Sequence, residues 1–102
     1  MDNSHITDLI QHNGWTNFAT YKVHMELFNE QFDYIEELWD QSNRDEHEFA
    51  QKLEDYLFEY LDYLKLPTLA MSCCREFLSQ VDFINLANSY SCDIRDARKE
   101  TI

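Results

Sequence analysis

The stretch EFAQKLEDYLFEYLDYL, residues 48–64, decides the fold class of this chain. Its apolar side chains recur at intervals of three and four residues, which is the spacing of one face of an α-helix. They are Phe49, Leu53, Tyr56, Leu57, Tyr60, Leu61 and Leu64. Acidic side chains mark the other side of the same helix. The pattern predicts a long amphipathic helix whose apolar stripe faces a core.

Helical spacing continues on both sides of this stretch. The chain has one Gly and one Pro among 102 residues, whereas β-sandwiches and barrels need turn residues every few strands. Further helices are predicted over residues 17–28, 30–41 and 68–81, with a short one carrying Ile6, Leu9 and Ile10 and a last one after Asp82. We therefore predict an all-α fold, a compact bundle of five or six helices.

Polar side chains at the joints predict where these helices begin. Ser, Thr, Asn and Asp are favoured there because their oxygens accept from unpaired N–H groups of the first turn. The predicted N-caps are Thr16, Thr68, Asp82 and one of Ser42, Asn43 or Asp45. Asn13 and Gly14 are predicted to end the first helix, since both tolerate the left-handed conformation that follows helix C-termini.

The length of the chain allows one domain, which we take to span residues 1–102. Residues 92–102 are charged with balanced signs, and we expect this tail to fray. The core candidates are large apolar residues on the inward faces of the predicted helices. They are Trp15, Phe18, Phe28, Phe32, Trp39, Leu57, Leu61, Phe77 and Phe83.

The net charge of −12 is concentrated in the middle of the chain. Residues 26–62 hold 13 acidic and 2 basic residues, a net charge of −11. Such a chain repels nucleic acid and anionic membranes, and it attracts the basic surfaces with which other proteins bind nucleic acid. The predicted partner is therefore a basic, nucleic-acid-binding surface of another protein, with no direct binding to nucleic acid or membrane.

Eight acidic residues form the candidate binding surface, on the polar faces of the two central helices. They are Glu30, Asp33, Glu37, Asp40, Glu48, Asp55, Glu59 and Asp62. Carboxylates at this spacing lie about 5–10 Å apart, which resembles the spacing of phosphates on a DNA strand. Two alternatives stay open: a solvated face that only confers solubility, and a divalent-metal site at the i, i+4 pairs Asp33/Glu37 and Asp55/Glu59.

Catalytic and cofactor motifs are missing from the sequence. The four His residues form neither HExxH nor a zinc-finger spacing, and a single Gly leaves no phosphate-binding loop. We predict no catalytic residue, no metal and no cofactor. The three cysteines, Cys73, Cys74 and Cys92, imply no disulfide framework. With no signal peptide or membrane span in the sequence, we expect a soluble cytoplasmic protein.

Two stretches resemble a known family. NGWTNFATYKVHMEL, residues 13–27, is similar to an NGWTN(Y/F)xTW motif, and LAMSCCREFLSQVDFINLANSY, residues 69–90, is similar to the C-terminal half of the same family. The family comprises small acidic proteins of phages, plasmids and bacteria, and is a domain of unknown function. This chain departs from it at Ala19, Tyr21 and Phe83, where the family usually has Glu, Trp and Trp. The resemblance implies a phage-type protein in a bacterial cell and transfers no catalytic residue.

Charge and resemblance together suggest a non-enzymatic phage or mobile-element inhibitor. It would use the acidic surface to block or mimic nucleic acid on a host defence nuclease complex, of the anti-CRISPR or anti-restriction type. One alternative is an adaptor or regulatory module that acts by hydrophobic contact or self-association, with Tyr34, Phe58 and Tyr63 as interface aromatics. A small metal-dependent enzyme is the other.

Overall fold

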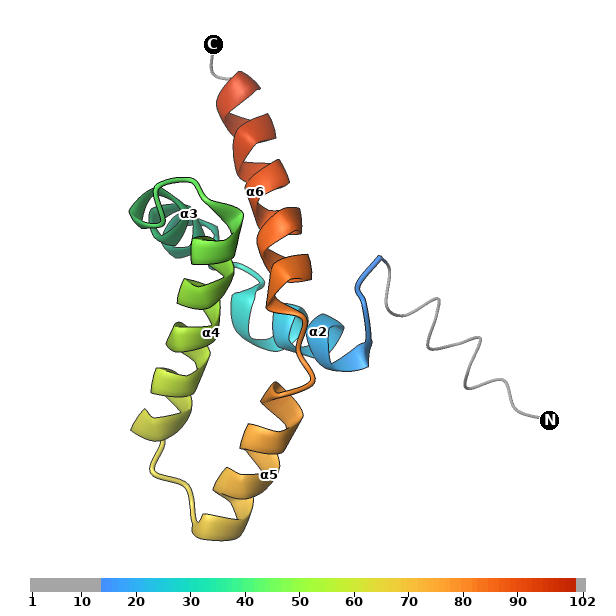
Figure 1. Ribbon diagram of the computed structural model, residues 1–102, viewed down its shortest axis with the longest axis vertical. Helices are drawn as coiled ribbons and strands as arrows, with labels where there is room; N and C mark the ends of the chain where they lie inside the picture. The colour runs from blue at the N-terminus through green and yellow to red at the C-terminus, as the bar shows by residue number, and fades with distance from the viewer. Residues whose placement is uncertain (1–13, 101–102) are drawn as a thin grey trace, which may run out of the picture.

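The computed structural model describes residues 14–100, and every regular element in that range is helical. The elements are α2 (Phe18–Val23), the π-helical turn η1 (His24–Phe28), α3 (Phe32–Gln41), α4 (Glu46–Tyr63), α5 (Thr68–Leu78) and α6 (Phe83–Glu100) (Figure 1). The prediction of an all-α fold is confirmed. The short helix predicted around Ile6, Leu9 and Ile10 lies outside the described residues.

Helices α4 and α6 form the centre of the fold. They lie side by side and make the most extensive contact of any helix pair in the described chain (Figure 1). Phe49 and Leu53 of α4, and Leu86, Ala87 and Ile94 of α6, are completely buried. Helix α3 packs on both central helices and α2 packs on α6. Of the apolar stripe that the sequence predicts in residues 48–64, the four residues Phe49, Leu53, Leu57 and Leu61 face the core, whereas Tyr60 and Leu64 are exposed.

Three of the helices begin at a side-chain cap. Asp45 accepts from the backbone N–H of Glu48 at 2.9 Å, and Asp82 accepts from that of Asn85 at 2.9 Å, as predicted. The cap of α2 is Asn17, which accepts from the N–H of Thr20 at 2.8 Å, so the prediction of Thr16 was wrong. Helix α5 follows Pro67 without a side-chain cap, so the prediction that Thr68 caps it was also wrong.

The turn η1 changes which face of the second helix is buried. Its closing bond runs from the N–H of Asn29 to the carbonyl of His24 at 2.8 Å, five residues back. This wider turn brings Phe28 inward, onto the side already buried by Val23. Phe18 is 44% exposed, so its predicted place in the core was wrong. The prediction assumed an unbroken 3.6-residue period, which a π-turn interrupts.

Phe32 is a second core prediction that was wrong, because it is 43% exposed. Residues 30–41 do not continue the preceding helix. The backbone of Glu30 adopts a left-handed conformation with φ of 74°, which restarts the chain in a new direction at α3. Ile35, Leu38 and Trp39 are then the residues of α3 that face the core.

The remaining core candidates fall into two groups. Phe28, Trp39, Leu57 and Leu61 are buried, as predicted, whereas three others are half-buried and pack against the edge of the core. These three are Trp15, Phe77 and Phe83.

The C-terminal tail differs from the prediction of fraying. Helix α6 continues to Glu100, and Ile94 within it is completely buried. Arg98 donates to Glu36 at 3.0 Å and to both carboxylate oxygens of Asp40, at 3.1 and 2.9 Å. These contacts reach residues about sixty positions earlier in the chain, so local charge balance could not reveal them.

Candidate functional site

The GWTN sequence at residues 14–17 fastens the joint between α5 and α6. The Thr16 hydroxyl donates to Asp82 Oδ2 at 2.8 Å, and the Thr16 N–H donates to Asn85 Oδ1 at 2.8 Å. The side-chain amide of Asn17 donates to the carbonyl of Gln80 at 2.8 Å. The most specific part of the motif is therefore used in holding two distant segments together.

We call the hydrogen bonds that join Thr16, Asn17 and Thr20 to residues 80–85 the clamp. Thr20 contributes to the clamp from a buried position. Its side chain is fully buried; the hydroxyl donates to Asn17 Oδ1 and accepts from the N–H of Asp82, both at 2.8 Å. The two stretches that carry the family resemblance thus meet in space. Gly14 has φ of 91°, a conformation that L-residues with a side chain rarely adopt.

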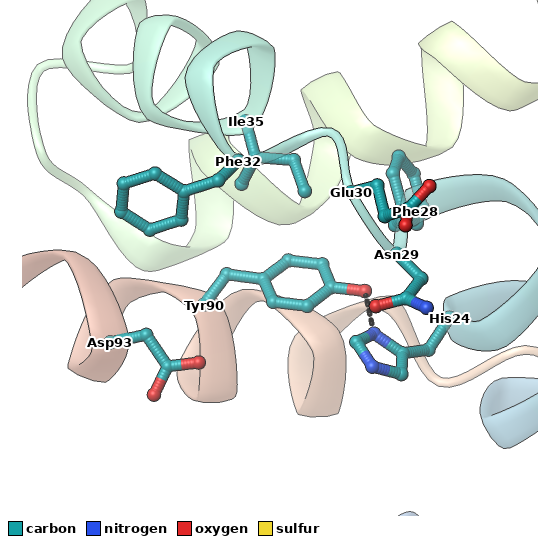
Figure 2. Close-up of a pocket in the computed structure, with 8 residues that line it drawn as sticks. All are labelled: His24, Phe28, Asn29, Glu30, Phe32, Ile35, Tyr90 and Asp93. Atoms are coloured by element: carbon teal, nitrogen blue, oxygen red, sulfur yellow. Dashed lines mark hydrogen bonds between the residues drawn. The ribbon is translucent and has the colours of Figure 1, made fainter.

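Trp15 covers a small polar cluster rather than an open site. Its ring lies 4.7 Å from that of His24 and 6.2 Å from that of Tyr90, measured between centroids. His24 Nδ1 is 2.7 Å from the Tyr90 hydroxyl, and Figure 2 shows Tyr90 reaching from α6 toward His24 with Asp93 further along the same helix. A half-buried Trp in this position is a packing residue.

A pocket of about 170 Å³ opens beside this cluster. Phe28, Asn29, Glu30, Phe32 and Ile35 complete its wall (Figure 2). Burial lowers the pKa of His24, against the opposing effect of Asp93, and burial raises the pKa of Tyr90. The pocket wall holds no Ser, Thr, Cys or Lys side chain that the His24–Tyr90 pair could activate, so we treat the pair as structural.

The lowered pKa of His24 predicts a pH-dependent stability. The unfolded chain, with the ordinary His pKa of 6.5, takes up a proton more readily than the folded chain, so stability falls as the pH drops below that value. The variant His24→Gln is expected to flatten this part of the curve in urea titrations. His47→Gln, at an exposed histidine, is the control and should follow the wild type. Parallel curves for wild type and His24→Gln would refute the assignment.

The predicted acidic surface lies on α3 and α4, with Glu30 in the turn two residues before α3. All eight of its members are exposed to solvent: Glu30, Asp33, Glu37, Asp40, Glu48, Asp55, Glu59 and Asp62. We call this set the acidic face. Tyr34 and Tyr56 pack together where the two helices meet, with ring centroids 4.9 Å apart. Burial raises the pKa of Tyr34, and Tyr56, Glu37 and Glu59 raise it further, which places carboxylates of both helices near one hydroxyl.

Arginines of the protein itself neutralise part of this surface. Asp40 is bound by Arg98 and lies 3.5 Å from Arg44, and hydrogen bonding to Arg98 holds the pKa of Asp40 below its usual range. Asp62 lies 2.6 Å from Arg75. These ion pairs were not predicted from the sequence. Asp40 and Asp62 therefore act as internal ion-pair partners, and the other six members carry the outward negative charge.

Two more acids outside the acidic face also pair with α6. Glu36 lies 2.9 Å from Arg98, and Glu46 lies 3.6 Å from Arg95. Arg95 also lies over the ring of Trp39, 5.9 Å from its centroid. Both arginines were missed because they were assigned to a frayed tail. The available signal was the spacing of four residues from Tyr90 to Ile94 and again from Ile94 to Arg98, which is a helical period that continues past residue 92.

The carboxylate pairs considered for a metal do not gain a further ligand. Over residues 14–100, no group of three or more His, Cys, Asp and Glu side chains comes together in a way that could hold a metal ion. Cys73 and Cys92 are exposed and Cys74 is half-buried, and all three are free thiols. None of them lies beside the His24 pocket.

Comparisons with known proteins give no relative: no family model, curated protein or solved structure matches the chain. The family resemblance of residues 13–27 and 69–90 therefore stays a prediction. Among the described helices, none has the length and apolar character needed to cross a bilayer.

Proposed function

We propose that this protein is a non-enzymatic inhibitor, encoded by a phage or another mobile element, that acts on a host defence nuclease complex of the anti-CRISPR or anti-restriction type. It binds the basic nucleic-acid site of that complex through the acidic face and thereby blocks or mimics nucleic acid. The observation that supports this proposal best is the exposure of all eight predicted carboxylates, seven of them on the packed helices α3 and α4 and Glu30 just before α3. The mobile-element origin rests on the resemblance alone.

An acidic surface of this kind lowers the stability of the folded chain. Like charges along α3 and α4 repel one another and destabilise the folded chain. The protein compensates Asp40 and Asp62 with arginines, yet it leaves the carboxylates around the Tyr34–Tyr56 pair facing outward. A basic partner would relieve this repulsion on binding. Tyr34, 37% exposed between these carboxylates, offers an aromatic contact of the kind that bases or arginines make.

Inhibition can be measured in cells and with purified components. We expect the expressed chain to restore phage plating on a strain that carries the target defence system, and to inhibit cleavage by the purified complex. Because the contact is electrostatic, affinity for the complex should fall at least about tenfold between about 50 and about 300 mM salt. Binding that is unchanged over this range would argue for hydrophobic contact instead.

An adaptor or regulatory module remains the second candidate, and one observation favours it. Tyr63 of α4 and Leu69 of α5 are 78% and 77% exposed, and an apolar groove lies between these two helices. Tyr34 and Tyr63 are thus exposed, as an interface role requires, whereas Phe58 is half-buried with Arg75 5.7 Å above its ring.

A further inference from the structure

The hairpin formed by the end of α4 and by α5 leaves a large apolar surface uncovered. Between the two helices and α2 lies a groove of about 370 Å³, with Leu27, Leu61, Leu64, Cys74, Phe77 and Leu78 among its lining residues. On the same two helices, Tyr63 and Leu69 project into solvent and do not line the groove. Leu69 and Cys73 of α5 are both exposed.

Helix α5 has little to hold it in place. Of its 11 residues only Leu78 is buried, and its main helix contact is with α4. An isolated helix shorter than about 12 residues is marginal in water, and most helical stability comes from packing an apolar face. A groove and a helix in this condition are expected to be covered by something in the stable protein.

The charge of the hairpin indicates what covers it. Residues 60–78 contain Asp62 and Glu76 against Lys65 and Arg75, a net charge of zero in a chain of net charge −12. A neutral surface offers a basic partner no electrostatic attraction, and two copies of this acidic chain repel one another less there than at α3 or the acidic residues of α4. The neutral hairpin is therefore suited to a second copy.

We propose that two copies of this chain associate through the α4–α5 hairpin, with Tyr63 and Leu69 of each protomer placed in the groove of its partner. The hairpin carries both exposed apolar side chains and an apolar groove. This combination suits a two-fold interface, in which the same patch of each subunit contacts that of the other. Helix α3 lies near the opposite end of α4 (Figure 1), so this association leaves its carboxylates exposed. The proposal does not depend on the inhibitor function, because it concerns different residues.

Light scattering coupled to size exclusion of the full chain tests this proposal. We expect a mass of twice the 12.3 kDa of the chain at about 100 µM, with dissociation on dilution. Leu69→Glu and Tyr63→Glu should each give a monomer with unchanged helical circular dichroism, because both side chains are exposed. Ile84→Glu is the control, a 40% exposed apolar residue on α6 with the same change in charge, and should remain a dimer.

Three outcomes would overturn the proposal. One is a monomer at every concentration, and another is a dimer that survives both hairpin variants. The third concerns a chain with Cys73→Ser and Cys92→Ser, in which Cys74 of the groove is the single thiol. If that chain is monomeric and its Cys74 reacts faster with a maleimide once residues 1–13 are removed, the occupant is the chain's own N-terminal segment.

Discussion

The triple variant Glu37→Lys, Asp55→Lys, Glu59→Lys is expected to bind the target complex at least about 100-fold more weakly than the wild type. The three carboxylates are exposed on α3 and α4, and Glu37 and Glu59 both lie near Tyr34. Asp40 and Asp62 are left unchanged because their arginine partners already neutralise them. Affinity measured by isothermal titration at about 100 mM salt gives the comparison.

A matched variant separates the position of the charges from their number. Glu76→Lys, Asp93→Lys, Asp96→Lys also changes three exposed acids, on α5 and α6, and brings the net charge from −12 to −6, as the first variant does. We expect it to lose less than about tenfold in affinity, through long-range attraction alone. Equal losses in the two variants would mean that total charge, and not the acidic face, governs binding.

Thr20→Val is expected to cause the largest loss of stability of any conservative change in the clamp, about 2–4 kcal/mol. Valine matches the shape of threonine, yet it removes the hydroxyl that the N–H of Asp82 donates to and that donates to Asn17. The site is completely buried, so water cannot replace the lost partner. Urea unfolding followed by circular dichroism measures the change in the free energy of unfolding.

The control for this prediction is Thr68→Val, at an exposed threonine that makes no side-chain cap to α5. It should change the free energy of unfolding by less than about 0.5 kcal/mol. A Thr20→Val protein as stable as this control would show that the clamp does not hold the α5–α6 joint, and the structural assignment of the GWTN sequence would then fail.

The fold class followed from the sequence because helical periodicity is a local property. Residues 48–64 carry an uninterrupted stripe, and Leu53, Leu57 and Leu61 are buried as that stripe predicts. The errors at Phe18 and Phe32 come from two features of the backbone. The π-turn η1 shifts the register of the second helix, and the left-handed Glu30 restarts the chain at α3; neither has a glycine or proline to mark it in the sequence.

The exposure of the acidic-face residues could be predicted from the sequence, but which of their carboxylates pair with arginines could not. Helical spacing places its carboxylates outward, which the structure bears out in their exposure. The pairing of Asp40 with Arg98 joins residues 58 positions apart, and it requires α6 to continue past residue 92 and to pack beside α3. No local pattern carries that information, so the two arginine-bound members could not be separated from the rest.

The sequence predicts that GWTN starts a helix, but it does not show which distant residues GWTN bonds to. A helix does start at this sequence, as predicted, but its cap is Asn17 and not the predicted Thr16. What sequence reasoning could not supply is the other half of the joint, since Thr16 and Asn17 bond to Asp82 and Gln80, more than sixty residues later. The motif thus explains how the ends of the fold are joined and contributes no reactive group.

Competition between the protein and nucleic acid for the same site is the most direct test of the proposed function. The target complex would be captured on the tagged chain, purified, and titrated with the wild-type protein at several concentrations of the nucleic acid that the complex binds. We predict that the apparent Kd rises in proportion to the nucleic-acid concentration, as mutually exclusive binding requires. An unchanged Kd, with protein and nucleic acid bound to the complex together, would contradict the proposal that the acidic face occupies the nucleic-acid site.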